Sequence, residues 1–200
     1  MVIDSSQLAM IGGLLSVAAY FPYTIATVRG QATPQRSSWF IWALLSAIAF
    51  ASVLHSGGTR GLVFTGAQMV GTNTVFLLSL WRGTGSIAQR SDATVLSFSA
   101  LGLALWWWTD NAAWAMALAI AVGTAGGSLT IAKAFNTPRS EVLTPWILQW
   151  LAATFGAASV LGASPLEMAY PLYLFLLYSG IAGATASGRV ARRRWGRHTP

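Results

Sequence analysis

Charged residues are scarce in this chain, and cysteine is absent. Only 8% of the 200 residues carry a charge, whereas 54% are hydrophobic. A soluble domain normally carries about a quarter charged residues, which cover its surface. Without cysteine, disulfides and thiolate metal sites are excluded. Burying this much apolar side chain in one globule would leave almost nothing polar to face water, so we expect lipid to be the solvent of the outer surface.

Groups that carry out catalysis are equally rare. The only histidines are His55 and His198, and no two carboxylates are placed together for acid–base or metal chemistry. We therefore expect no enzyme, no cofactor and no metal. The net charge of +7 raises the question of nucleic acid, but the basic residues lie in short stretches between apolar runs rather than along one face. No nucleic-acid partner is expected.

Seven apolar runs have the length of a membrane crossing, which needs roughly 17–25 mostly apolar residues. Polar residues, glycine or proline separate the runs. The expected helices cover residues 8–28, 38–54, 61–80, 93–109, 113–133, 143–161 and 165–187. The sequence therefore predicts an all-α, multi-pass integral membrane protein with seven transmembrane helices, whose first partner is the lipid bilayer.

The basic residues give the orientation, because loops on the cytoplasmic side of a membrane carry the excess of Lys and Arg. With the N-terminus outside, the outer side receives only Arg60, and the inner side receives all the others of the 12. Those are Arg29, Arg36, Arg82, Arg90, Lys133, Arg139, Arg189, Arg192, Arg193, Arg194 and Arg197. We expect a cytoplasmic basic tail at 188–200, in a plasma membrane or a bacterial inner membrane.

The chain also resembles itself. The segment 24–26 repeats at 130–132, Trp39 matches Trp146, and 51–54 repeats at 158–161. This internal repeat predicts two three-helix bundles, 8–80 and 113–187, joined by a linker helix at 93–109. Because the linker makes one crossing, both bundles run in the same sense and are parallel repeats about an axis along the membrane normal.

A local motif accompanies this architecture. Tyr20-Phe21-Pro22-Tyr23 is followed by Arg29-Gly30 and then by Ser37-Ser38-Trp39. With the arrangement of three, one and three helices, this motif resembles the SWEET/PQ-loop transporter superfamily, of which the chain looks like a divergent member. The resemblance implies a transporter with its N-terminus outside. The family's glutamine is Tyr23 here, so a sugar substrate is not inherited from the resemblance.

Pro22 lies inside the first expected helix, where it removes a backbone hydrogen bond. We predict that Pro22 and Tyr23 form a gating hinge; the alternative is a kink that does not move. Gln68 and Asn73 are amides in a hydrocarbon environment, which is costly unless they face a partner or water. They are therefore either substrate ligands or interhelical hydrogen bonds. The resemblance implies that Asn73 lies on the helix that carries a substrate-binding asparagine in sugar-type relatives.

Paired indoles stand at corresponding places of the two bundles. Trp39 and Trp42 share one face of the second expected helix, and Trp146 and Trp150 share one face of the sixth. They either flank a planar or ring-shaped substrate or belong to the aromatic belt at the membrane interface. Tyr170 and Tyr173 are weaker candidates for the substrate site.

The predicted function is a facilitative, alternating-access transporter, a uniporter for a sugar or another small polar metabolite. Asp110 and Glu167 are expected at the outer interface, so coupling to protons would lack its usual machinery. The alternative is a non-transporting membrane subunit or a receptor-like module with the same fold. Pairing with a second copy of the chain stays open.

Overall fold

The computed structural model describes residues 4–30, 32, 34, 36–83, 90–136 and 143–195, which form seven helices and no strand. The helices are α1 (Ser5–Val28), α2 (Arg36–His55), α3 (Leu62–Arg82), α4 (Arg90–Thr109), α5 (Ala113–Asn136), α6 (Leu143–Ser159) and α7 (Pro165–Trp195). The predicted all-helical fold class is confirmed, and each helix overlaps the run expected for it. We call α1–α3 the first triplet and α5–α7 the second triplet.

The largest difference from the expected boundaries lies in the last helix. The sequence predicts an end at 187, but α7 continues to Trp195. No glycine or proline interrupts residues 189–195, and the alanine and arginines there favour helix. The first part of the expected basic tail is therefore helical, while 196–200 and Arg139 lie outside the described residues.

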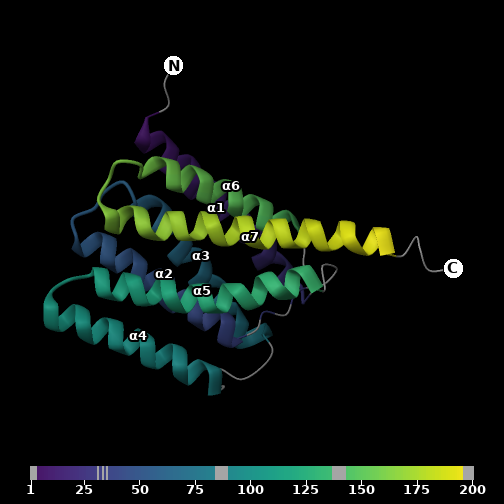
Figure 1. The fold of residues 1–200 in the computed structure, drawn as a ribbon, viewed down its shortest axis with the longest axis horizontal. Helices are drawn as coiled ribbons and strands as arrows, with labels where there is room; N and C mark the ends of the chain where they lie inside the picture. The colour runs from purple at the N-terminus through teal and green to yellow at the C-terminus, as the bar shows by residue number, and fades with distance from the viewer. Residues whose placement is uncertain are drawn as a thin grey trace.

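The two triplets pack by the same rule (Figure 1). In each, the third helix packs against the first two: α3 against α1 and α2, and α7 against α5 and α6. Between the triplets, α1 packs against α6, and α2 packs against α5. Exchanging one triplet for the other leaves this pattern unchanged. Helix α4 lies at one edge of the bundle, beside α5.

Equivalent helices of the two triplets also end in the same way. After α2, Gly57 adopts a left-handed backbone with φ of 72°, and after α6, Gly162 adopts one with φ of 76°. This conformation favours glycine, because it has no Cβ, and it closes many helices. The turns that lead into α3 and α7 therefore begin alike, as two copies of one unit would.

Many large apolar side chains lie on the outside of the bundle, while several small polar ones are buried within it. Large apolar side chains point outward, among them Leu14, Phe21 and Leu176, which are 65%, 65% and 68% exposed. Small polar side chains are fully buried instead, namely Ser16, Thr27, Ser46, Ser52, Thr65, Ser79, Ser159 and Thr185. In water such an apolar surface would drive association. It is the arrangement expected of a bundle surrounded by lipid.

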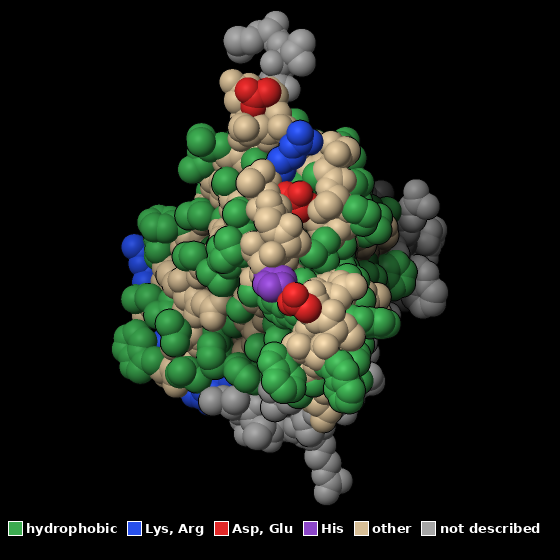
Figure 2. All heavy atoms as spheres, turned by 90° about the vertical axis from the view of Figure 1, so that its left-hand side faces the viewer, with side chains coloured by type: hydrophobic (Ala, Val, Ile, Leu, Met, Phe, Trp, Pro, Cys, Tyr) green, Lys and Arg blue, Asp and Glu red, His purple; other side chains and the backbone are tan. Residues whose placement is uncertain are grey.

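The two ends of the bundle differ in charge. The end where α1 begins carries Asp4, His55, Arg60, Asp110 and Glu167. Figure 2 looks onto this end and shows acidic side chains and the histidine among apolar ones. The opposite end carries Arg29, Arg36, Arg82 and Arg189. Among the described residues, arginine is thus concentrated at the end where α1 finishes.

Three helices are long and apolar enough to cross a membrane by length and composition. They are Ser5–Val28, Leu62–Arg82 and the part of α7 from Pro165 to Val190. Shorter apolar helical stretches cover Trp39–His55 and Ala113–Thr124 among the described residues. Three of the seven expected helices are therefore compatible with a membrane crossing, and the seven crossings themselves stay a prediction.

Candidate functional site

Four polar side chains meet inside the bundle where the triplets join. They are Tyr20 of α1, Gln68 of α3, Gln149 of α6 and Tyr178 of α7, and we call them the central cluster. The Tyr20 hydroxyl donates a hydrogen bond to Gln68 Oε1 over 2.6 Å, and the Tyr178 hydroxyl donates to the same oxygen over 3.5 Å. Gln68 Nε2 donates to Gln149 Oε1 over 3.1 Å. The cluster therefore links two helices of each triplet.

Each side chain of the central cluster is buried, and Gln68 is only 1% exposed. A buried amide is tolerated when its polar atoms are paired, and the pairing is stronger in low-dielectric surroundings. Gly71 makes this arrangement possible, because the Tyr20 ring occupies the space that a Cβ on Gly71 would take. Gln68 and the gap left by Gly71 thus lie on neighbouring turns of α3 and receive Tyr20 together.

Aromatic side chains flank the central cluster on both sides. The Trp39 ring lies edge-on to Tyr20 with the centroids 6.3 Å apart, and the Trp146 ring lies 6.1 Å from Tyr178. Trp39 and Trp146 are the residues that the internal repeat matches. A continuous path of side chains therefore leads from an indole of α2, through the Gln68 amide, to an indole of α6.

The second indole of each pair contacts other side chains. Trp42 packs edge-on against Trp39 at 5.2 Å. Trp150 Nε1 donates to the hydroxyl of Ser179 over 2.9 Å, and its ring stacks on Phe175. All four predicted indoles are half-buried, whereas Trp107 is 88% exposed. Whether these pairs flank a substrate or belong to the aromatic belt at the membrane interface stays open.

Asn73 is bound to backbone rather than to the central cluster. Its Nδ2 donates to the carbonyl of Met69 in its own helix over 2.8 Å and to the carbonyl of Ala43 in α2 over 3.4 Å. Of the two interpretations offered by the sequence, the interhelical hydrogen bond is the one present in this conformation. Asn73 belongs to the packing of α2 on α3.

The predicted hinge lies beside the central cluster. Pro22 is exposed on α1, which stays helical through it, and the Tyr23 ring packs 5.1 Å from Trp39. A second proline, Pro171, lies inside α7. Each proline removes one helical hydrogen bond. The interior proline of α1 therefore has a counterpart in the second triplet that lies in α7 rather than in α5.

Tyr170 and Tyr173 lie in the second triplet, nearer the start of α7. Tyr170 is 5% exposed within the main apolar core, and its ring lies 6.0 Å from that of Tyr173. Tyr173 packs its hydroxyl against Gly123 of α5. These tyrosines therefore contribute to α5–α7 packing, one to three turns away from Tyr178.

Sequence reasoning missed three members of the central cluster. Gln149 stands in the middle of an apolar run, so the cost of a buried amide that singled out Gln68 applied to it equally. Tyr20 was noticed only as part of the motif around Pro22. Tyr178 had no signal of its own, because a tyrosine in an apolar helix is as common in packing as in binding.

Glu167 makes a second link between the triplets, at the end where α1 begins. Its Oε2 accepts the backbone N–H groups of Arg60 and Gly61 over 3.0 and 3.2 Å. Gly61 is the N-cap of α3, where N–H groups lack helical partners and favour a negative charge. Glu167 thus lies at the end of the bundle where the sequence expects it, but it is only 8% exposed and folded under the α2–α3 turn.

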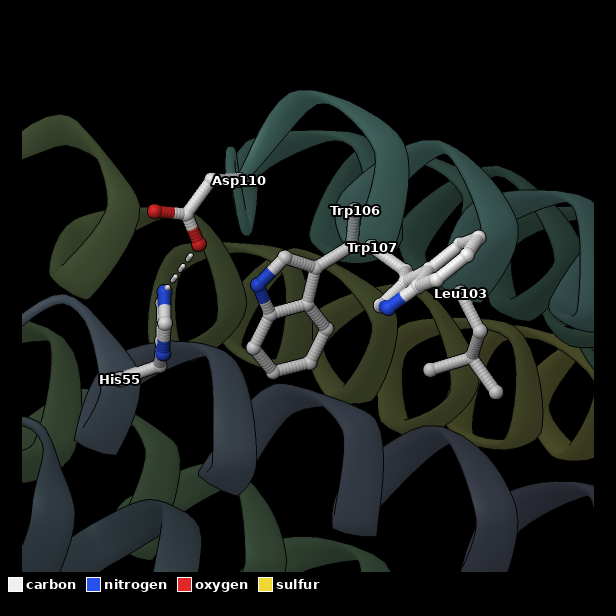
Figure 3. Close-up of a pocket in the computed structure, with 5 residues that line it drawn as sticks. All are labelled: His55, Leu103, Trp106, Trp107 and Asp110. Carbon is white, nitrogen blue, oxygen red and sulfur yellow. Dashed lines mark ion pairs between the residues drawn. The ribbon is translucent and has the colours of Figure 1, made fainter.

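A surface cavity of about 280 Å³ lies at the same end, away from the central cluster. Its lining is His55, Leu103, Trp106, Trp107 and Asp110 (Figure 3). His55 Nε2 lies 3.2 Å from Asp110 Oδ1, and the Trp106 ring packs against the imidazole. The Asp110 side chain is 88% exposed, so water screens the pair and it adds about 0–1 kcal/mol. This cavity joins α2 to the α4–α5 turn and does not open onto the junction.

Comparison with family models, curated proteins and solved structures finds no match to this chain.

Proposed function

We propose that this protein is a membrane carrier that moves a small neutral solute down its concentration gradient by alternating access. The observation that carries the proposal is the central cluster. It is polar, uncharged and buried, and it lies where the two triplets meet, well inside the helices that supply it. Polar side chains inside a membrane bundle are costly, and they mark pathways for solutes.

The membrane location is supported by composition and by the distribution of side chains. Three helices suit a bilayer crossing, and the outward-facing side chains are predominantly apolar while hydroxyls and amides are turned inward. The arginines gather at one end. Under the rule that cytoplasmic segments are basic, that end faces the cytoplasm and the start of α1 faces outside.

The packing of the helices supports two parallel repeats. Exchanging the triplets preserves which helices are the main packing partners, although α1 packs more extensively on α6 than α5 does on α2, and Gly57 and Gly162 close equivalent helices. Transporters built from parallel repeats hold their substrate between the repeats and rock one against the other. The SWEET/PQ-loop resemblance of the motif around Pro22 agrees with this mechanism.

Only a few of the described polar contacts between the triplets must break before the bundle can open at either end. At the central cluster these are the Gln68–Gln149 and Tyr178–Gln68 hydrogen bonds. At the end where α1 begins they are the bonds from Arg60 and Gly61 to Glu167. Interhelical hydrogen bonds in membrane proteins contribute about 0.6 kcal/mol on average, and about 1.7 at most. Thermal motion can therefore separate the triplets, with Pro22 and Pro171 as the points where the helices bend.

The mechanism needs no coupled ion. The four side chains of the central cluster are two amides and two phenols, none of which is charged at neutral pH. A neutral solute can exchange hydrogen bonds with them without neutralising a charge, so flux follows its gradient in either direction.

Flux into liposomes tests the proposal. Purified protein should pass at least one member of a panel of radiolabelled neutral sugars, nucleobases, vitamins and amides faster than protein-free liposomes. The flux should saturate and should not change with a pH gradient. Failure of folded protein to pass any member of the panel contradicts the proposal.

One observation favours the second candidate function, a non-transporting subunit or receptor-like module. In this conformation, Phe64, Met116 and Ile181 are fully buried apolar side chains of the bundle core. A bundle that stays so packed in all states would recognise a partner rather than pass a solute. Stable co-purification with another membrane protein, together with absent flux, would support this alternative.

A further inference from the structure

The hydrogen bonds of the central cluster determine which groups become available when the triplets separate. Both phenol hydroxyls donate to Gln68 Oε1, which uses the two lone pairs of that oxygen. Gln68 Nε2 and Gln149 Oε1 bond only across the junction. Separation therefore leaves an N–H donor on α3 facing a carbonyl acceptor on α6, and it also frees the Tyr178 hydroxyl of α7 from Gln68 Oε1.

Each group then loses its partner and needs a new one, which a bound ligand can supply. A buried donor or acceptor without a partner costs about 1–3 kcal/mol. A ligand that carries a carbonyl beside an N–H satisfies both at once: its carbonyl accepts from Gln68 Nε2 and its N–H donates to Gln149 Oε1. This pairing reproduces the amide–amide contact that the two glutamines make with each other.

The surroundings add a preference for a flat ligand. The Trp39 ring packs on Tyr20 and the Trp146 ring packs on Tyr178, so four aromatic rings border the amides. Aromatic rings stack on planar heterocycles, with centroids 4.5–7 Å apart. Aromatic rings beside the Gln68 and Gln149 amides suit a planar heterocycle that has its polar groups on one edge.

One more buried hydroxyl is available to such a ligand. Ser16 lies one turn before Tyr20 on the same face of α1, and its Oγ is fully buried without a hydrogen-bond partner among the described residues. An orphan hydroxyl in a well-packed interior needs an explanation. A second carbonyl on the ligand would give it a partner.

A polyhydroxylated sugar matches these groups poorly. A hexose brings about five hydroxyls, each of which loses about 1–3 kcal/mol if it is buried without a partner. Separation frees the Gln68 N–H, the Gln149 carbonyl and the Tyr178 hydroxyl, which are fewer groups than a hexose would need as partners. A ring with a lactam edge needs only one donor and one acceptor.

The geometry points to a substrate class: a planar, neutral heterocycle with a lactam or ureide edge, held between Gln68 and Gln149. This inference rests on the proposed function, and it deepens it by naming what the carrier recognises.

Binding to the full chain in detergent tests the inference separately from transport. Uracil carries the lactam edge, 1,3-dimethyluracil replaces both N–H groups with methyls, and glucose is a neutral polyol. We expect uracil to raise the melting temperature in a saturable way, and the other two to leave it unchanged. Ligand that binds the folded state raises the melting temperature by mass action.

Variants link the shift to the amides. Gln149→Leu removes the acceptor, and we expect it to weaken uracil binding by about tenfold or more, since a lost buried hydrogen bond of 1.4 kcal/mol corresponds to tenfold. Gln149→Asn keeps the amide on a side chain that is one methylene shorter, so the amide no longer reaches the ligand. It should weaken binding while the fold is kept. Thr74→Val on the exposed face of α3 is the matched control, and it should bind like the unaltered chain.

The outcomes separate the two proposals. A shift with glucose and none with uracil overturns the lactam assignment and leaves the carrier proposal standing. An equal shift with uracil and 1,3-dimethyluracil also overturns it, because the N–H would then play no part. Saturable uracil binding by a chain that passes no solute into liposomes upholds the recognition and overturns the carrier.

Discussion

Gln68 of α3 donates a side-chain hydrogen bond to Gln149 of α6 over 3.1 Å, and this bond joins the two triplets in the middle of an apolar bundle. Gln68 also accepts from Tyr20 and Tyr178. Because one amide serves three partners, the stability of the junction and the recognition of a solute depend on the same side chain.

A double-mutant cycle measures this coupling. Gln149→Leu leaves Gln68 Nε2 without its acceptor and should lower the free energy of unfolding by about 1–3 kcal/mol. Gln68→Leu should cost more, because Tyr20 and Tyr178 lose their acceptor as well. The double variant should be more stable than the sum of the two losses predicts. Denaturant titration in detergent micelles gives the three values, and strict additivity would contradict a direct bond.

Gly71→Ala tests the packing of the Tyr20 ring against Gly71. A Cβ at this position would overlap the Tyr20 ring, so the ring must move away from Gln68. We expect a loss of about 1–3 kcal/mol in unfolding free energy, typical of overpacking. Gly183→Ala on α7 is the matched control, because no atom lies within 4 Å of the added carbon. It should be neutral or stabilising by up to about 1 kcal/mol. Equal effects of the two substitutions would contradict the packing.

The difference between Gln68 and Gln149 shows how far sequence reasoning reaches. Apolar runs and glycine punctuation predict the helices well, because a helix in lipid must satisfy its own backbone. Gln68 was identified by the cost of a buried amide. Its partners lie 48, 81 and 110 residues away in the chain, and no local pattern encodes such pairings. The partners of Glu167 could not be predicted for the same reason, since its acceptor role depends on a turn more than a hundred residues distant.

Glu167→Ala tests the second link between the triplets, at the end of the bundle where α1 begins. The N–H groups of Arg60 and Gly61 would lose their shared acceptor, and the unfolding free energy should fall by about 1–3 kcal/mol. Glu167→Gln keeps an acceptor oxygen and should lose less. Asp110→Ala removes an exposed carboxylate paired with His55 and should change stability by at most about 1 kcal/mol. A larger loss for Asp110→Ala than for Glu167→Ala would contradict the account.

The absence of native cysteine makes the orientation easy to test. Thr59→Cys lies in the α2–α3 turn, and Ser187→Cys lies near the far end of α7; both positions are exposed. An impermeant maleimide added to intact cells should label the first thiol and reach the second only after the membrane is opened. The reverse pattern would place the arginine-rich end outside and contradict the proposed topology.

The central claim is that the two triplets separate alternately at either end of the bundle. Spin labels at exposed positions of opposite triplets measure this directly: Thr59 with Leu161 at one end, and Val28 with Ser187 at the other. Pulsed electron resonance in lipid nanodiscs should give two distance populations for each pair, and the solute that passes in the liposome panel should shift the two pairs in opposite directions. A single, unchanging distance at both ends would contradict the carrier.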